Sequence, residues 1–473
     1  MGNGVIGLSV ADELLRRSPS LRVTVIGPRH RSGGASAAAG AMLGCFGEIT
    51  KYTLASDAGR AKFEIARAAH ARWPELLERL LDGADSKELS LTDETYVILN
   101  GRSGPLDRQN FNALCDALDS YGAPHAMVEG VPGLRPAPDA WPLRAMRIEG
   151  EGTLDATELL RLLERSVESN SGNVVDATVT CLRQRDRKVS GVECSDGSVI
   201  EARQVVIAAG AFSTPLLDDA LGPGTVQPQF AGSGVAFRAE RVMGEGFSSA
   251  VRTVNRAGSC GLHVVPLYGA REYYGATNVV FRDPELRSHL GVCHFLAQSA
   301  MDQLDQHTCF SRIDEVKVGN RPVPLDGFPL IGPTSIAGLT VLTGTYRDGL
   351  HAAPQLASWA AALIIDGRND FPAIFAPERR PIETMSVQES IEEFVLQSTS
   401  SMYESGTVLP RFTDHEELGA LFEPKAYDLY DQIGDHLALH PDLITYLTMS
   451  RKDPADVEYV AAYLRSGIST GGT

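Results

Sequence analysis

The start of the sequence carries three glycines whose spacing suits the binding of a pyrophosphate group. Gly2, Gly4 and Gly7 form the pattern G-x-G-x-x-G, which allows a tight turn, a close approach of phosphate and close packing of a helix on a strand. Val5 and Ile6 begin an apolar pattern with helical spacing, and the positive end of such a helix would face the phosphates. The motif predicts a dinucleotide site, although the same spacing also occurs by chance in loops.

One element that this motif normally requires is missing from the sequence. The apolar residues at 21–26 predict the strand that follows the helix, but only Met1 precedes the glycines. We therefore expect the strand that delivers the turn to be absent. Either leading residues are missing from the chain, which is the interpretation we favour, or another segment fills that position.

A run of very small residues at 33–44 suits close contact with a flat ligand. Ser36, Ala39, Gly40 and Met42 belong to this run, which cannot form a core by itself. The alternative interpretation is a flexible loop.

Composition and charge limit the class of protein. With 473 residues the chain can hold two or three domains, and its net charge of −17 argues against nucleic acid or an anionic membrane as the main partner. The seven cysteines include no C-x-x-C pair, so we expect reduced thiols and no metal site. No apolar run reaches the roughly 20 residues of a membrane span, and we find no secretory signal. These features predict a cytoplasmic protein.

The apolar patterns predict mixed helices and strands, with a strand-rich region in the middle of the chain. Helical spacing covers 53–81, 111–118, 156–167, 297–304 and 352–365. Strand patterns include 95–99, 189–194, 198–202, 204–211, 262–266, 272–277 and 339–344. Asp155 predicts a helix N-cap, and Asp196-Gly197 predicts a hairpin turn.

Six stretches together resemble the FAD-dependent amino-acid oxidase family, and most closely its glycine and sarcosine oxidase branch. In chain order they are G-N-G-V-I-G at 2–7, G-A-S-A-A-A-G-A at 34–41, V-V-I-A-A-G-A-F at 205–212, V-V-P and then Y-Y-G-A-T between 264 and 277, R-P-V-P-L-D-G-F-P-L-I-G-P at 321–333, and T-G-T-Y-R-D-G-L at 343–350. No single stretch is decisive, and the resemblance rests on the ordered set.

This resemblance implies an α/β fold with a Rossmann-like FAD-binding domain of the glutathione-reductase/para-hydroxybenzoate-hydroxylase type. The FAD-binding domain would consist of 1–50, 150–214 and 321–381. A mainly antiparallel-sheet substrate domain would consist of 51–149 and 215–320. Residues 382–473 would form an all-α C-terminal extension outside the family's usual extent.

The resemblance also implies which residues contact FAD. Besides the glycine motif and the small residues 36–42, these are Val175 near the adenine, Ala209 and Gly210 near the pyrophosphate, and the backbone of Arg347, Asp348, Gly349 and Leu350 beside the flavin ring. The strand at 21–26 lacks the usual acid for the ribose, so we expect backbone groups or Arg29 to bind it. No cysteine occurs at 321–325, so we expect the FAD to be non-covalent.

For the substrate, the resemblance points first to Arg321, because a guanidinium group matches a carboxylate with two hydrogen bonds. The alternative is a structural pair with Asp326. Arg347 is expected to contact the substrate or to line the entrance, or else to pair with Asp348 at the surface.

Two further residues are candidates for the substrate side of the flavin. His263 occupies a position where relatives often carry a substrate-facing tyrosine, and there it could respond to charge near neutral pH. Its alternative is an ordinary core or surface histidine. Tyr274 lies on one face of its predicted strand, and a core position is the interpretation we favour.

The C-terminal extension is acidic and helical. Residues 382–473 contain 16 acidic and 5 basic side chains. Capping boxes at 386–389 and 413–416, and Asp453 before Pro454, predict helix starts, and the segment reads as three to five helices. It would be a helical cap or an oligomer contact, or a docking surface for a basic protein partner or a bulky substrate.

The resulting prediction is an FAD-dependent oxidase of a small amino acid or N-substituted amine. A hydride would leave for flavin N5, the imine would hydrolyse, and O2 would be reduced to H2O2. The alternatives are a dehydrogenase that passes electrons to another acceptor, and a catalytically weak FAD-binding assembly subunit.

Overall fold

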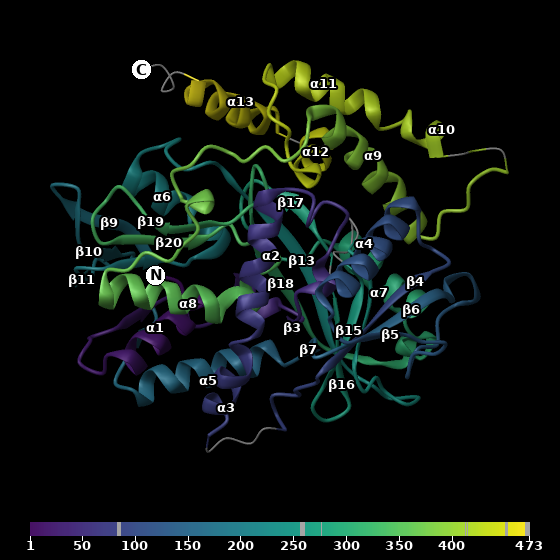
Figure 1. Ribbon diagram of the computed structural model, residues 1–473, viewed down its shortest axis with the longest axis horizontal. Helices are drawn as coiled ribbons and strands as arrows, with labels where there is room; N and C mark the ends of the chain where they lie inside the picture. Colours follow the sequence, from purple (N-terminus) through teal and green to yellow (C-terminus); the bar gives the residue numbers. More distant parts are fainter. Residues whose placement is uncertain are drawn as a thin grey trace.

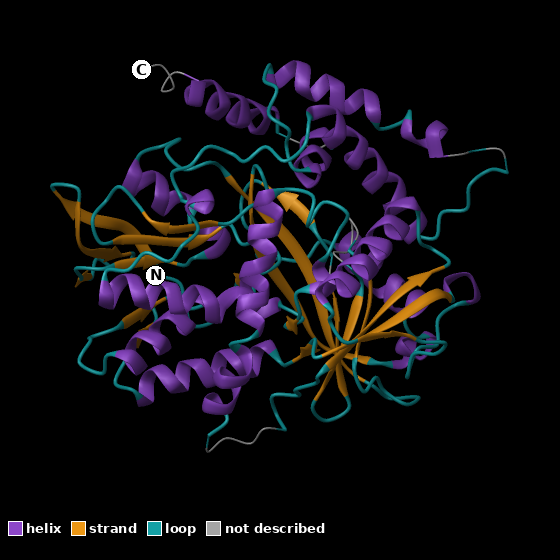
Figure 2. Ribbon diagram, viewed as in Figure 1, coloured by secondary structure: helices purple, strands orange, loops and turns teal. Residues whose placement is uncertain are grey.

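The structure is a computed structural model, and it describes residues 1–82, 87–255, 261–275, 277–411, 413, 415–449 and 453–468. Two systems of strands stand side by side, and the C-terminal helices lie along one edge of both (Figures 1 and 2).

The larger system is a mostly antiparallel sheet of ten strands in the order β2-β18-β13-β16-β15-β14-β4-β6-β5, with β17 paired to β13. The pairs β14–β4 and β2–β18 are parallel. The strands are β2 (Gly33–Gly34), β4 (Glu94–Asn100), β5 (His125–Met127), β6 (Pro142–Glu149), β13 (Gln229–Glu240), β14 (Ala250–Thr253), β15 (His263–Leu267), β16 (Arg271–Gly275), β17 (Val279–Phe281) and β18 (Arg312–Pro324).

The smaller system consists of short strands in separate groups. β1 (Thr24–Ile26) pairs in parallel with β8 (Asn173–Val175). β12 (Val205–Ile207) pairs in parallel with β20 (Leu339–Thr343), which also pairs with β19 (Leu330–Pro333). The predicted hairpin at 196–197 is confirmed, since β10 (Lys188–Cys194) pairs antiparallel with β11 (Val199–Glu201) and with β9 (Val179–Arg185). A last pair joins β3 (Met42–Leu43) and β7 (Gly152–Thr153).

Met1 and Gly2 bridge the two parallel groups of the smaller system. The Met1 nitrogen donates to the Val206 carbonyl at 2.7 Å, and the Met1 carbonyl accepts from the Ala208 N–H at 2.8 Å. The Gly2 N–H donates to the Ile26 carbonyl at 2.8 Å. No later segment among the described residues runs between β1 and β12. Among the described residues, Met1 and Gly2 themselves thus connect β1 to β12.

Helices cover the smaller system. α1 (Val5–Arg17) packs between α5 (Ala156–Ser169) and α8 (Gly349–Asp366), and their apolar side chains share a buried core. Asp155 caps α5 as predicted, because its carboxylate accepts from the Thr157 N–H at 2.8 Å. The other helices before the extension are α2 (Asp57–His70), α3 (Trp73–Leu80) and α6 (Thr214–Leu221), and α4 (Pro105–Tyr121) and α7 (Leu290–Gln303), which pack on the large sheet.

The segment 53–81, predicted to be helical, forms two helices, α2 and α3. Pro74 lies in the first turn of α3. A proline there has no N–H to donate, and its ring clashes with the carbonyl four residues earlier, so the first helix ends before it. α4 and α7 are longer than their apolar patterns predicted.

The C-terminal extension contains five described helices, within the predicted range: α9 (Val387–Glu404), α10 (His415–Gly419), α11 (Glu423–Ile433), α12 (Pro441–Thr448) and α13 (Pro454–Ile468). The capping box at Ser386 and Glu389 is confirmed, with the Glu389 N–H 3.2 Å from the Ser386 hydroxyl. The second predicted box includes residue 414, which lies outside the described residues. None of the described helices is long and apolar enough to cross a bilayer.

The extension packs on the large sheet through a shared apolar core. Phe230, Val280 and Val323 from the sheet contact buried residues of the extension, including Leu443 and Ile444 of α12. The extension is therefore docked onto the rest of the chain, as the helical-cap interpretation expects.

Candidate active site

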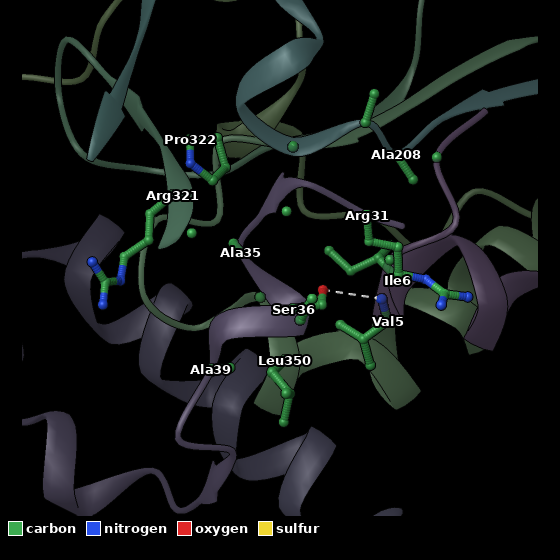
Figure 3. A pocket seen from close by; sticks show the side chains of 18 of the residues that line it. Val5, Ile6, Arg31, Ala35, Ser36, Ala39, Ala208, Arg321, Pro322 and Leu350 are labelled. Carbon is green, nitrogen blue, oxygen red and sulfur yellow. Dashed lines mark hydrogen bonds between the residues drawn. The ribbon is translucent and has the colours of Figure 1, made fainter. Parts of the chain in front are cut away.

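A cavity of about 600 Å³ lies where the smaller strand system meets the large sheet (Figure 3). This volume is in the range of ligand sites in proteins. The walls come from the glycine motif, the small residues 34–42, residues 208–210, β18 and the segment 343–351.

The glycine motif builds one end of the cavity. Gly2 has a φ of +99°, and a Cβ there would lie 2.2 Å from the Ala208 carbonyl oxygen. A Cβ on Gly7 would lie 2.0 Å from the Gly2 carbonyl oxygen. Both positions therefore require glycine. The Gly7 residue supports the turn from behind and does not itself line the cavity.

The N-terminus of α1 faces the same end, since Gly4, Val5 and Ile6 line the cavity. Gly4 caps the helix without a side-chain hydrogen bond, and the first turn contains no acidic residue. The Ser36 hydroxyl accepts from the Val5 N–H at 3.1 Å (Figure 3). An uncapped helix start without acids attracts anions, so this end fits the pyrophosphate of a dinucleotide.

The other end of the cavity is narrow and lined by small side chains. A Cβ on Gly40 would lie 2.4 Å from Nε2 of His263. Ala39 and Met42 line this end of the cavity, as do Asp348, Gly349 and Leu350 at the start of α8. Such small side chains leave room for a flat ring, and the helix start would stabilise negative charge on it. The residues present therefore fit FAD.

Ala209 and Gly210 line the cavity as predicted, but Arg29 and Val175 do not. Arg29 is exposed, and its backbone N–H donates to the Asp176 carboxylate at 2.9 Å. Val175 is paired to Ile26 within the sheet. The chain leaves the sheet after β1 and again after β8. Residues 177–180 therefore line the cavity in place of Arg29 and Val175.

Adjacent tyrosines on β16 face opposite sides of the sheet, because side chains alternate along a strand. Tyr273 lines the cavity, and its hydroxyl donates to the Ala38 carbonyl at 2.7 Å. Tyr274 faces away into a buried cluster, where its hydroxyl is 2.5 Å from Glu272. Tyr274 is thus a core residue, and the candidate role beside the flavin falls to Tyr273, which the sequence analysis missed.

His263 lies at the cavity wall and is only 4% exposed. Its ring is stacked on Tyr273, with the centroids 5.6 Å apart. Nδ1 is 2.8 Å from the Gly261 carbonyl and so carries the proton, whereas Nε2 has no partner among the described residues. Burial lowers the pKa of His263 to about 4. Burial therefore favours the neutral ring near neutral pH and argues against the expectation that it responds to charge there.

Arg321 extends from β18 on the opposite side of the cavity from Val5 and Ile6 (Figure 3). Its guanidinium donates to the Thr277 carbonyl at 3.1 Å and approaches the Asn278 amide oxygen at 3.4 Å. Within the described chain, no carboxylate pairs with it. The alternative partner, Asp326, is instead held by Arg379.

The alternative interpretation of Arg347, an ion pair with Asp348 at the surface, does not describe the structure either. Asp348 forms an ion pair with Lys62 at 3.0 Å. Arg347 lies over the Tyr346 ring and approaches the Asp442 carboxylate of α12 at 3.4 Å. Asp442 comes from the C-terminal extension, and no motif or spacing in the sequence linked it to this site.

A second buried pair supports the same wall. Glu48 lines the cavity, and its carboxylate is 2.6 Å from Arg252, which is almost completely buried on β14. Burial by itself would raise the pKa of Glu48, but Arg252, and Arg347 after it, hold that pKa below its usual value. Glu48 is therefore a compensated anion.

Solved structures with this fold include amino-acid oxidases. Glycine oxidase from Geobacillus kaustophilus has 24% identity and a TM-score of 0.67, and the alignment covers 80% of this chain and 97% of that one. Iminodiacetate oxidase from Chelativorans sp. BNC1 has 20% identity and a TM-score of 0.65, with coverage of 80% and 97%. At these identities the similarity establishes the fold.

Sequence comparisons agree with this fold. The bifunctional protein ThiO/ThiG from Trichormus variabilis is 26% identical over 389 residues, which cover 78% of this chain and 53% of the relative. The chain thus spans about half the length of the curated relatives it matches. Residues 1–363 match the family described as FAD dependent oxidoreductase, or DAO. The chain therefore belongs to the DAO family of FAD-dependent oxidoreductases.

Proposed function

We propose that this enzyme oxidises the C–N bond of an amino acid or N-substituted glycine to an imine, which water then hydrolyses. The observation that carries the proposal is Arg321, a guanidinium without a described carboxylate partner at the wall of a cavity whose other end suits a dinucleotide. Such a group binds a carboxylate through two hydrogen bonds.

The chain's own residues would hold and orient the substrate. Arg321 binds the carboxylate, and the stacked rings of His263 and Tyr273 shield the reacting carbon from water. Nε2 of His263 accepts a hydrogen bond from the substrate nitrogen, since this ring is neutral and its Nδ1 already donates to Gly261. A ring with so low a pKa is a poor base, so it orients the amine rather than removing its proton.

FAD bound at this site would supply the two-electron acceptor for a hydride from the C–H bond, with O2 as the final oxidant that is reduced to H2O2. No cysteine lies at 321–325, so the cofactor is bound without a covalent link. The amides at the starts of α1 and α8 provide its anion contacts.

The test is an anaerobic screen of amino acids and N-alkyl glycines for bleaching of the flavin absorbance. Bleaching by at least one amine, followed by peroxide formation in air, is the expected result. Reoxidation without peroxide would favour a dehydrogenase. A yellow protein that no amine reduces would contradict the proposal and favour a binding or assembly role.

Arg321→Lys separates carboxylate recognition from the rest of the reaction. We expect the KM of the best amine to rise about 30-fold or more, which corresponds to roughly 2 kcal/mol for a lost charge-assisted contact. Arg312→Lys is the matched control, because Arg312 lies on the same strand with an exposed side chain. Steady-state kinetics would contradict the assignment if both variants kept the wild-type KM.

A further inference from the structure

Asp442 is a buried carboxylate that reaches the active site from outside the family's part of the chain. It lies in the first turn of α12, is 5% exposed, and is beyond the residues 1–363 that match the family. Its Oδ2 accepts from Asn278 Nδ2 at 3.1 Å, from the Tyr346 hydroxyl, and from Arg347 at 3.4 Å.

These three partners connect Asp442 to both arginines of the substrate wall. Tyr346 and Arg347 line the main cavity and also an adjoining cavity of about 220 Å³ between the extension and the rest of the chain. The Asn278 amide oxygen in turn lies 3.4 Å from Arg321. The extension therefore lines the adjoining cavity and, through Asp442, contacts residues that line the main one.

The charges at this wall cancel in pairs with one exception. Arg347 is matched by Asp442, Glu48 by Arg252, and Asp348 by Lys62. The ring of His263 is buried and neutral. Among the described residues this leaves Arg321 as the cavity-lining cation with no carboxylate opposite it.

We propose that Asp442 sets the charge selectivity of the site: by compensating Arg347 it leaves one guanidinium for the substrate, and so restricts the enzyme to amines with a single carboxylate. The inference rests on the proposed function in one respect, namely that Arg321 receives a carboxylate. A second substrate carboxylate near Arg347 would find the charge of that arginine already balanced by Asp442 behind it, and would lie beside the cavity-lining carboxylates of Glu48 and Asp348; such like-charge contacts reject a ligand. Asp442 is a positioning residue, since it acts through Arg347 and Asn278.

The experiment compares mono- and dicarboxylate binding in the wild-type holoenzyme and in Asp442→Asn. Acetate and malonate are titrated, and their Kd values are read from the flavin absorbance change or by calorimetry. The wild type is expected to bind acetate more tightly than malonate. The isosteric amide keeps an acceptor for Tyr346 and Asn278 but removes the charge, so we expect the malonate-to-acetate affinity ratio to rise about 10-fold or more.

Asp456→Asn is the matched control. Asp456 is a buried carboxylate of α13 that accepts from the Tyr446 hydroxyl at 2.5 Å and from Arg282 at 3.1 Å, and none of these three residues lines either cavity. It should leave the affinity ratio unchanged, whatever it does to stability. The proposal would be overturned if the malonate-to-acetate affinity ratio were the same in the wild type and in Asp442→Asn. It would also be overturned if Asp442→Asn and Asp456→Asn shifted that ratio equally.

Two further outcomes keep the inference separable from the proposed function. If the wild type already binds malonate as tightly as acetate, the inference fails without any variant. If no amine reduces the flavin but the ratio still shifts in Asp442→Asn, the oxidase proposal fails and the charge-selectivity inference stands. Where an amine is oxidised, the kcat/KM ratio of iminodiacetate to sarcosine should shift in the same direction.

Discussion

His263 illustrates how burial changes the chemistry that a side chain can perform. In water an imidazole changes its protonation near neutral pH. Here desolvation lowers the pKa to about 4, and the Gly261 carbonyl selects the tautomer that leaves Nε2 as an acceptor. The residue is thus suited to accept a hydrogen bond and unsuited to act as a pH sensor.

This burial predicts a particular dependence of stability on pH. The unfolded chain binds a proton at His263 near pH 6.5 and the folded chain only near pH 4, so unfolding takes up a proton between these values. Acidification from pH 7 to pH 4 should therefore cost the wild type roughly 3 kcal/mol at this site. His263→Asn, which can retain the donor to Gly261, should lose less stability over that range.

Denaturant unfolding at pH 7 and pH 4.5 measures the difference between the two proteins. The exposed His30, changed to Asn, is the control and should follow the wild type. A pH dependence that is the same for His263→Asn and the wild type would show that the ring is not held neutral in the folded state.

At the scale of elements, the turn before α1 depends on backbone geometry more than on any side chain. Gly2 has a left-handed φ and lies against the Ala208 carbonyl, and Gly7 lies against Gly2. The three segments at 2–7, 26 and 206–208 are joined by backbone hydrogen bonds through Met1 and Gly2. Anything that separates them displaces the helix start from the cofactor end of the cavity.

Gly2→Ala should therefore weaken both FAD binding and stability. The added Cβ would lie 2.2 Å from a backbone oxygen, so the turn must move, and we expect a loss of stability above 2 kcal/mol and about a 10-fold weaker FAD affinity. Thermal unfolding and fluorescence titration of the apoprotein with FAD are the measurements.

Gly122→Ala provides the control for the backbone conformation alone. Gly122 also has a left-handed φ, of +61°, but a Cβ there would contact nothing within 4 Å. It should cost only about 1 kcal/mol and leave FAD affinity unchanged. Equal effects of the two variants would mean that the close packing at Gly2 is not important for the site.

At the scale of the whole molecule, the acidic extension is continuous with the core of the enzyme. Its apolar residues share one cluster with β13, β17 and β18, and its Asp442 contacts the cavity-lining Arg347. The predicted protein partner or oligomer contact of the acidic surface stays a prediction. The docked face, in contrast, is already occupied by the enzyme's own sheet.

We therefore expect the extension and the flavin site to unfold together. Ile391→Ala in α9 removes a fully buried side chain from the shared cluster and should lower stability by about 2–5 kcal/mol. The transitions followed by far-UV circular dichroism and by flavin release should shift together. Val408→Ala, at a site that is 92% exposed, should shift neither.

This prediction would be contradicted if the extension and the flavin site unfolded in two separate transitions and Ile391→Ala shifted only the transition of the extension. They would indicate that the extension is an independent unit. In that case its contribution to the substrate wall would depend on a docking equilibrium.

Local patterns in the sequence determined much of the fold. The glycine turn, the cap at Asp155, the hairpin at 196–197 and the start of α9 are each encoded by neighbouring residues, because capping and turn formation involve groups only a few positions apart. The ordered motifs were sufficient to indicate the family, and they singled out Arg321 and the start of α8, both of which line the cavity.

Only the tertiary structure decided which side chains face the cavity and which charges remain uncompensated. Tyr273 and Tyr274 are equivalent in the sequence, and the packing of β16 assigns one to the cavity and the other to the core. Arg347 and Asp442 are 95 residues apart and meet because α12 packs on the large sheet. Ion pairing depends on distance in space, which local periodicity does not encode, so the sequence indicated the cations of the site but not their partners.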